Sequence, residues 1–176
     1  MKKVSFLVLL LSLFTFVLFM SQREGPSVSN IPTITVSTFA LYDIVKHIGG
    51  DEIKVEMVIP FGVEVHSFEP TPKTIIEIQK SQLFFYSGAD LEPWISNLAQ
   101  GKNLRDMSKY VHLRAPEEGD ENDPHHHHEA VDPHYWLDLG NMQLLAKEIA
   151  LELGTIDPQH SDLYRQRAEA YIRQLA

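Results

Sequence analysis

Cysteine is absent from this chain of 176 residues. Its absence excludes disulfide bonds, thiolate zinc sites and the lipid-modified cysteine that tethers many exported proteins. Any metal site must therefore use histidine and carboxylate ligands. The sequence also contains no His-Glu-x-x-His pattern and no glycine-rich phosphate-binding motif. The usual signatures of zinc hydrolases and nucleotide-binding enzymes are missing, so we expect a binding protein rather than an enzyme.

Basic residues are outnumbered, with 15 Lys and Arg against 24 Asp and Glu, which gives a formal net charge of −9. The chain therefore lacks the basic footprint that nucleic-acid binding requires. Six of the acids fall in one stretch that contains no base, and outside it 15 basic residues face 18 acidic ones. The negative charge is thus local to that stretch. Its acids are Glu117, Glu118, Asp120, Glu121, Asp123 and Glu129.

The N-terminus has the pattern of an export signal. Met1-Lys2-Lys3 precedes an uncharged, mostly apolar run over residues 4–20, which matches a basic n-region followed by an apolar h-region. Residues 1–22 are expected to be a signal peptide or, because no clean cleavage context follows, an uncleaved N-terminal anchor. The polar residues 23–32 are expected to be a linker. Direct membrane contact is expected only through the N-terminal segment.

Strand and helix patterns alternate from residue 33 onward. Apolar and β-branched runs predict strands at 34–39, 53–59, 83–88 and 103–107, and helices at 41–48, 73–82 and 92–98. Thr71-Pro72 is typical of a helix cap followed by proline at the first helical position. This alternation predicts an α/β fold with a four-stranded, mainly parallel sheet flanked by helices.

Two further helices are predicted near the C-terminus. Apolar residues recur at helical spacing from Met142 and indicate a helix that ends at Gly154. Asp157-Pro158 then caps a last helix with one apolar stripe. That stripe consists of Tyr164, Ala168, Tyr171 and Leu175.

Two histidines are candidate metal ligands. His66 follows the predicted strand 53–59, and His134 precedes the Met142 helix. Imidazole is the commonest nitrogen ligand for zinc and similar ions. Ligands of open parallel sheets bind beyond the carboxyl ends of the strands, so the two rings can converge there. The alternative is that each is an ordinary hydrogen-bonding residue in a polar loop.

Three carboxylates near these histidines could orient a ligand ring: Glu64, Asp132 and Asp138. Glu64 could equally be a solvated carboxylate or a turn former. Asp138 could equally cap the Met142 helix.

Residues 116–131 are expected to form a loop without regular structure. Its donor side chains could all bind metal, but a loop in which nothing packs cannot impose one geometry, so several ions should bind weakly and exchange quickly. The alternative is a merely solvated loop. The candidate accessory ligands are Asp120, Glu121, Asp123, His125, His126, His127, His128 and Glu129.

Four segments together resemble the zinc/manganese family of periplasmic metal-binding proteins that feed ABC importers. They are Gly62-Val63-Glu64-Val65-His66-Ser67-Phe68-Glu69-Pro70, Thr71-Pro72-Lys73, Gly88-Ala89-Asp90-Leu91-Glu92-Pro93-Trp94 and Asp132-Pro133-His134-Tyr135-Trp136-Leu137-Asp138. They occur in the family's order, and the resemblance covers about residues 33–175.

The resemblance implies a first metal-binding lobe over residues 33–157, with the 116–131 loop inside it. Residues 158–176 would begin the helix that links two lobes, and the second lobe would be absent from a truncated chain. His66 and His134 would be the first lobe's two ligands, with the other ligands in the second lobe.

The resemblance also implies a periplasmic location, an ABC transporter permease as the partner and Zn(II) as the transported ligand, ahead of Mn(II). The loop would scavenge or sense zinc. The alternative function is a standalone periplasmic metal buffer or chaperone built around the histidine loop. A second lobe encoded downstream would favour the importer, whereas a true stop after Ala176 would favour the buffer.

Overall fold

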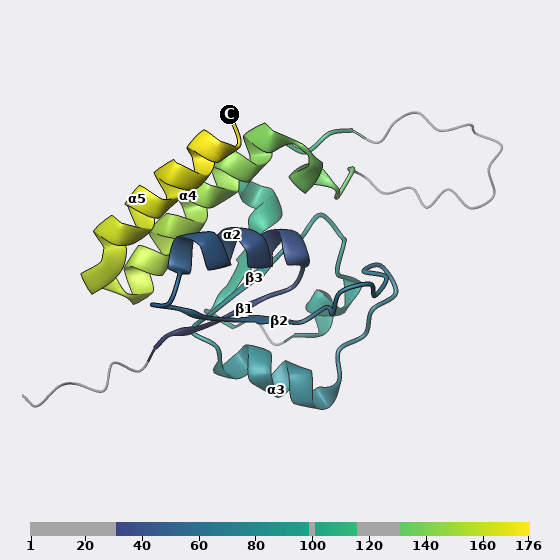
Figure 1. The fold of residues 1–176 in the computed structure, drawn as a ribbon. Coiled ribbons are helices and arrows are strands. Elements are labelled where there is room, and N and C mark those ends of the chain that lie inside the picture. The colour runs from purple at the N-terminus through teal and green to yellow at the C-terminus, as the bar shows by residue number, and fades with distance from the viewer. Residues whose placement is uncertain (1–30, 99–100, 116–130) are drawn as a thin grey trace, which may run out of the picture. The chain divides into compact units, whose positions relative to one another are not determined.

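The computed structural model describes residues 31–98, 101–115 and 131–176, and Figure 1 shows them as a ribbon. The expected signal or anchor (1–22) and nearly all of the linker (23–32) lie outside these ranges. The predicted loop 116–131 lies outside them too, except for its last residue. Among the described helices, none combines the length and the apolar composition needed to cross a bilayer.

A four-stranded parallel sheet forms the centre of the described part. Its strands are β1 (Thr33–Val36), β2 (Lys54–Met57), β3 (Leu83–Tyr86) and β4 (Leu104–Asp106). They lie in the order β2-β1-β3-β4, and each neighbouring pair is parallel. The predicted α/β fold with a parallel sheet is confirmed.

Helices cover both faces of this sheet (Figure 1). On one face lie α2 (Phe39–Gly49), α4 (Leu139–Ile156) and α5 (Ser161–Gln174), and on the other lies α3 (Pro72–Lys80). Single 3₁₀ turns complete the described elements. They are η1 (Pro93–Asn97), η2 (Met107–Tyr110), η3 (Tyr135–Leu137) and η4 (Pro158–His160).

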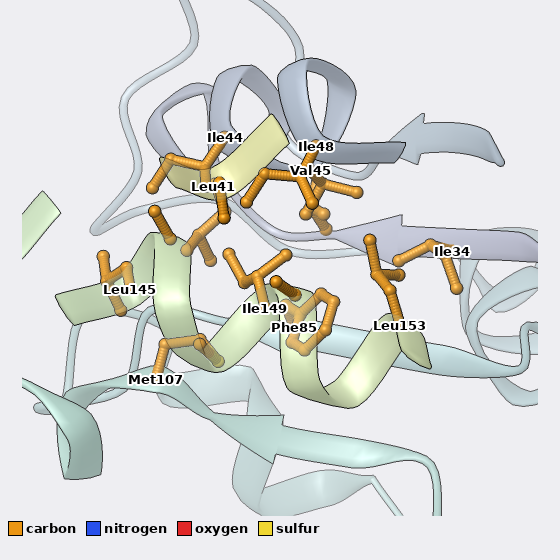
Figure 2. Close-up of a cluster of buried hydrophobic side chains, with 14 of the residues drawn as sticks. Ile34, Leu41, Ile44, Val45, Ile48, Phe85, Met107, Leu145, Ile149 and Leu153 are labelled. Carbon is orange, nitrogen blue, oxygen red and sulfur yellow. The ribbon is translucent and has the colours of Figure 1, made fainter. Parts of the chain in front are cut away.

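Each face of the sheet has its own buried cluster because strand side chains alternate between faces. Ile34 and Phe85 pack with residues of α2 and α4, and Figure 2 shows them in one cluster with Leu145, Ile149 and Leu153 of α4. Phe84 packs on the opposite side with residues of α3 and η1. The run Leu83–Phe85 is therefore buried throughout, as in a strand covered on both faces, and β3 ends at Tyr86, before the end of the predicted strand 83–88.

The predicted strand 34–39 was too long. β1 ends at Val36, and Phe39 already begins α2. Ser37 still pairs with β3 through its backbone, because its N–H donates to the Phe85 carbonyl at 2.9 Å, but Thr38 is already the N-cap residue of α2. The side chains of both residues hydrogen-bond to the Ser87 side chain just beyond β3, which fixes this exit from the strand. Tertiary contacts thus override the β-branched pattern.

The predicted helix end at Gly154 was wrong, because α4 continues to Ile156. A Cβ atom at Gly154 would lie 2.6 Å from Ser161 Oγ and 3.2 Å from Ser161 Cβ. Glycine is present so that the first turn of α5 can approach α4 closely, not as a helix terminator.

The helix starts were predicted with mixed success. Thr71 caps α3, and its hydroxyl accepts the Thr74 N–H at 3.2 Å, as predicted. Asp157 was predicted to cap the last helix, but α5 begins later, at Ser161. The Asp157 carboxylate accepts instead from the Tyr164 hydroxyl at 2.5 Å and contacts His160 Nδ1 at 2.7 Å.

Candidate metal centre

The structure brings His66 and His134 together. Their ring centroids lie 5.7 Å apart with an angle of 60° between the ring planes. His66 belongs to the segment that follows β2, and His134 immediately precedes η3. Both residues are exposed, His134 with 44% of its side-chain surface accessible. Two residues that are 68 positions apart in sequence thus form one accessible imidazole pair.

The spacing of this pair suits one shared metal ion. With zinc–nitrogen bonds of about 2.0–2.1 Å and tetrahedral angles, two rings on one ion have centroids about 5 Å apart. The observed 5.7 Å is slightly longer. The centroid spacing is therefore within about 1 Å of that expected for two imidazoles on one ion.

Asp132 orients the His134 ring. Its Oδ1 lies 2.8 Å from His134 Nδ1 and accepts the His134 backbone N–H at 2.9 Å. These bonds, the backbone one foremost, hold the pKa of the Asp132 carboxyl below its usual value. An ionised carboxylate at Nδ1 favours the tautomer with the proton there, which leaves the lone pair on Nε2 for a metal.

The backbone beside His134 is anchored from two directions. The buried Tyr135 hydroxyl donates to the Ser87 carbonyl at 2.8 Å. The buried Asn141 amide donates to the Tyr135 carbonyl at 3.2 Å and to the His112 carbonyl at 3.0 Å. The His134 ring also lies edge-on to Trp136, with centroids 5.3 Å apart. His134 therefore sits on a segment tied to both β3 and α4.

His66 lies on a segment held by a local turn and by an aromatic contact. Glu64 Oε1 accepts the His66 backbone N–H at 3.2 Å, which makes Glu64 a turn former in this structure. Phe68 fixes the far side of the segment, because its ring lies edge-on to the buried Trp94 with centroids 6.1 Å apart.

Asp138 makes the contacts of a helix cap. Its Oδ1 accepts the N–H groups of Gly140 at 2.8 Å and Asn141 at 3.4 Å, and its Oδ2 accepts from Arg114 at 3.0 Å. The N–H of Gly140 and the Arg114 guanidinium hold the pKa of this carboxyl below its usual value. Of the two alternatives for Asp138, these contacts favour the cap of α4.

A small polar pocket of about 80 Å³ beside His134 is lined in part by His112 and by two residues that sequence reasoning missed, Arg114 and Asn141. Arg114 reaches this place because its carbonyl accepts the Asp132 N–H at 3.0 Å, in an antiparallel bridge. A single bridge between two irregular segments leaves no periodic signal. Asn141 could have been noticed only as a polar residue within an apolar helix pattern.

The described residues hold only part of a metal coordination shell. Within 31–98, 101–115 and 131–176 there is no group of three or more His, Cys, Asp or Glu side chains placed to hold an ion. A tetrahedral site needs about four ligands. The predicted accessory ligands of the loop, Asp120, Glu121, Asp123, His125 to His128 and Glu129, lie outside the described residues.

Comparisons with known proteins match this chain to metal-binding proteins, most of them named as parts of metal transporters. A family model described as zinc-uptake complex component A, periplasmic, matches residues 34–176. The manganese ABC transporter substrate-binding lipoprotein scaA of Streptococcus gordonii is 30% identical over 99% of this chain. The zinc-binding lipoprotein AdcA of Streptococcus pneumoniae is 29% identical over 99% of it.

The fold is shared with solved structures of such proteins. The metal-dependent lipoprotein YcdH from Bacillus subtilis superposes with a TM-score of 0.69 at 29% identity, over 82% of this chain and 52% of its own. This chain spans 58% of the length of scaA and 36% of that of AdcA. The match therefore covers one part of the longer relatives.

Proposed function

Because this chain belongs to the ZnuA family of periplasmic zinc-uptake components, we propose that it captures a divalent metal ion and delivers it to an ABC transporter permease. This family consists of solute-binding proteins and not of enzymes. The observation that carries the proposal is the exposed pair His66 and His134, with Asp132 holding the His134 ring. Here the metal is cargo, so an accessible, partly formed site is what the function needs.

Zn(II) is the proposed cargo, ahead of Mn(II). Two imidazole nitrogens favour borderline ions such as zinc, whereas manganese prefers carboxylate and other oxygen ligands. The relatives include a protein named for manganese and one named for zinc. The nitrogen pair in this chain is what supports the choice between them.

The remaining ligands are proposed to come from a second lobe. Residues 33–157 would form the first lobe, and residues 158–176 would begin the helix that connects the two. In support, α5 occupies Ser161–Gln174 and packs its buried Tyr164, Ala168 and Tyr171 against this lobe. The His/acid loop would supply zinc to the pair or sense its concentration.

The test compares zinc binding by the intact protein with that by His66→Ala and His134→Ala. Each variant removes one of about four ligands, so a loss of at least 100-fold in zinc affinity is expected. His47→Ala is the control, because His47 is also an exposed histidine but contacts the Asp43 carbonyl in the last turn of α2. Competition with Mn(II) in the same titration tests the choice of ion.

Two outcomes would contradict the proposal. If both single variants bind zinc like the unmodified protein, the pair is not the site. If replacing His125 to His128 with Ala removes the tight binding while His66→Ala and His134→Ala keep it, the loop is the primary site and the buffer function is favoured.

A further inference from the structure

A buried polar cluster lies where β1 and β3 end, and its Ser87 accepts a hydrogen bond from Tyr135, the residue after His134. Ser37, Thr38, Ser87 and Glu92 are each at most 6% exposed. The Ser87 hydroxyl lies 3.1 Å from Thr38 Oγ1 and 3.5 Å from Ser37 Oγ. Buried polar groups cost free energy unless they are paired, so such a cluster calls for an explanation beyond packing.

Glu92 holds the backbone that leaves β3. Its Oε1 accepts the Ser87 N–H and its Oε2 accepts the Gly88 N–H, both at 2.9 Å. The next two residues, Ala89 and Asp90, have φ angles of 50° and 61°. Such left-handed residues other than glycine are strained, so the turn needs contacts that hold it. Burial raises the pKa of the Glu92 carboxyl, whereas the hydrogen bonds to it act in the opposite direction.

Gly88 is required at this turn for two reasons. Its φ angle is 74°, which favours glycine. A Cβ atom there would also lie 2.0 Å from Asp106 Oδ1 at the end of β4. The turn is thus fixed against the neighbouring strand as well as by Glu92.

The peptide unit between Ser87 and Gly88 is hydrogen-bonded at both its N–H and its C=O. Its N–H, on Gly88, donates to Glu92, and its C=O, on Ser87, accepts from the Tyr135 hydroxyl at 2.8 Å. Hydrogen bonds in such a chain polarise and strengthen one another. The end of β3 therefore sets the position of the Tyr135 side chain.

We propose that Tyr135 is a positioning residue for metal binding, which acts by fixing the His134 backbone through the Ser87–Gly88 peptide that Glu92 holds. The inference rests on the proposed function of the His66 and His134 pair. Tyr135 directly follows His134 and is 5% exposed. The Leu137 N–H donates to the His134 carbonyl at 3.1 Å, so His134 and Tyr135 share one 3₁₀ turn. A shift of the Tyr135 ring must then move His134 relative to His66.

The test is Tyr135→Phe, which keeps the ring and removes the hydroxyl. Tyr164→Phe is the matched control, because Tyr164 is fully buried and its hydroxyl donates to Asp157 at 2.5 Å, in the corner between α4 and α5. Both variants are expected to lower the melting temperature. Zinc affinity, measured by competition with a chromophoric chelator, should fall in Tyr135→Phe only, by up to about 10-fold, the lower end of the cost of losing a direct partner of a metal ligand, because the Tyr135 hydroxyl contacts Ser87 and acts on His134 through the backbone.

A spectroscopic readout separates positioning from stability. Co(II) replaces zinc in the titration, and its visible spectrum reports the ligand geometry at the site. We expect an altered spectrum in Tyr135→Phe and an unaltered one in Tyr164→Phe. If Tyr135→Phe does not fold, Glu92→Gln serves instead. Its amide NH₂ would face one of the two N–H donors, so zinc affinity should fall and the Co(II) spectrum should change in the same direction.

The inference is overturned if the tested variant binds zinc like the unmodified protein, or if Tyr164→Phe weakens binding equally. Its failure is distinguishable from failure of the proposed function. If His134→Ala loses zinc while Tyr135→Phe does not, only the positioning role is wrong. If His134→Ala also keeps its zinc, the pair itself is not the site.

Discussion

Replacing Asp132 is expected to weaken zinc binding without unfolding the chain. Asp132→Ala removes the oxygen that faces His134 Nδ1 at 2.8 Å and accepts the His134 N–H at 2.9 Å. Without it the ring can rotate and either ring nitrogen can carry the proton, so the binding-competent tautomer and orientation are less populated.

The size of the effect follows from the exposure of the contact. Losing the outer partner of a metal-bound histidine typically costs 10- to 100-fold in affinity. The side chains of Asp132 and His134 are both 44% accessible, so water can partly replace the lost acceptor. We therefore expect the lower end of that range, a loss of about 10-fold or about 1.4 kcal/mol of binding free energy. Asp132→Asn keeps an acceptor and should fall in between.

Asp138→Ala is the matched control, because Asp138 is the other aspartate of the same motif and lies four residues from the same histidine. Its carboxylate caps α4, so the variant should melt a few degrees lower and bind zinc with unchanged affinity. Zinc titration against a chromophoric chelator and thermal unfolding by circular dichroism measure both quantities. The reasoning is refuted if Asp138→Ala loses zinc affinity while Asp132→Ala keeps it.

Four further outcomes are expected. With the loop histidines replaced, the 176-residue chain should bind zinc with a dissociation constant of about 1 μM or weaker, near −8 kcal/mol by calorimetry, since under the two-lobe proposal the His66 and His134 pair supplies only two of about four ligands; nanomolar binding would contradict that proposal. Zinc binding by the loop should disappear as the pH falls through about 6.5, because imidazole must be neutral to bind, and histidine NMR shifts would report it. The stability difference between the unmodified chain and Asp138→Ala should be present at neutral pH and vanish as the pH falls below about 3.9 and through the lowered pKa of the folded state, because a carboxyl with a depressed pKa stabilises only while ionised; thermal melts across that range check it. Gly154→Ala should destabilise the chain by about 1–3 kcal/mol through its clash with Ser161, and a double variant with Ser161→Gly should recover part of that loss in urea unfolding.

The layout of the fold could be predicted because the chain's local patterns agree with its tertiary structure. The apolar run that begins at Leu83 indicated the strand observed as β3, and Thr71-Pro72 indicated the start of α3. The errors occurred where a distant contact decides the local structure. Ser37 bonds to Ser87, and Gly154 contacts Ser161, so neither residue behaves as its sequence neighbours suggest.

The candidate site was predictable in part. The position of strand ends and the family resemblance pointed to His66 and His134, and the structure places the two rings side by side. Sequence could not separate Asp132 from Asp138, because both are acids close to His134 and only the direction of each side chain distinguishes them. The contact between Tyr135 and Ser87 joins residues 48 positions apart, and no local pattern encodes it. The metal-binding roles of these residues stay predictions.

The two buried clusters do not include His66 or His134. The described hydrophobic core is thus built without either candidate ligand, whereas the core of a zinc finger depends on its metal ligands and unfolds when the ion is removed. An ion on the pair adds stability only through mass action, by an amount that grows with the logarithm of its concentration over the dissociation constant. For the proposed carrier, loading and unloading would therefore leave these buried clusters in place, and a chain that has given up one ion would already be folded for the next.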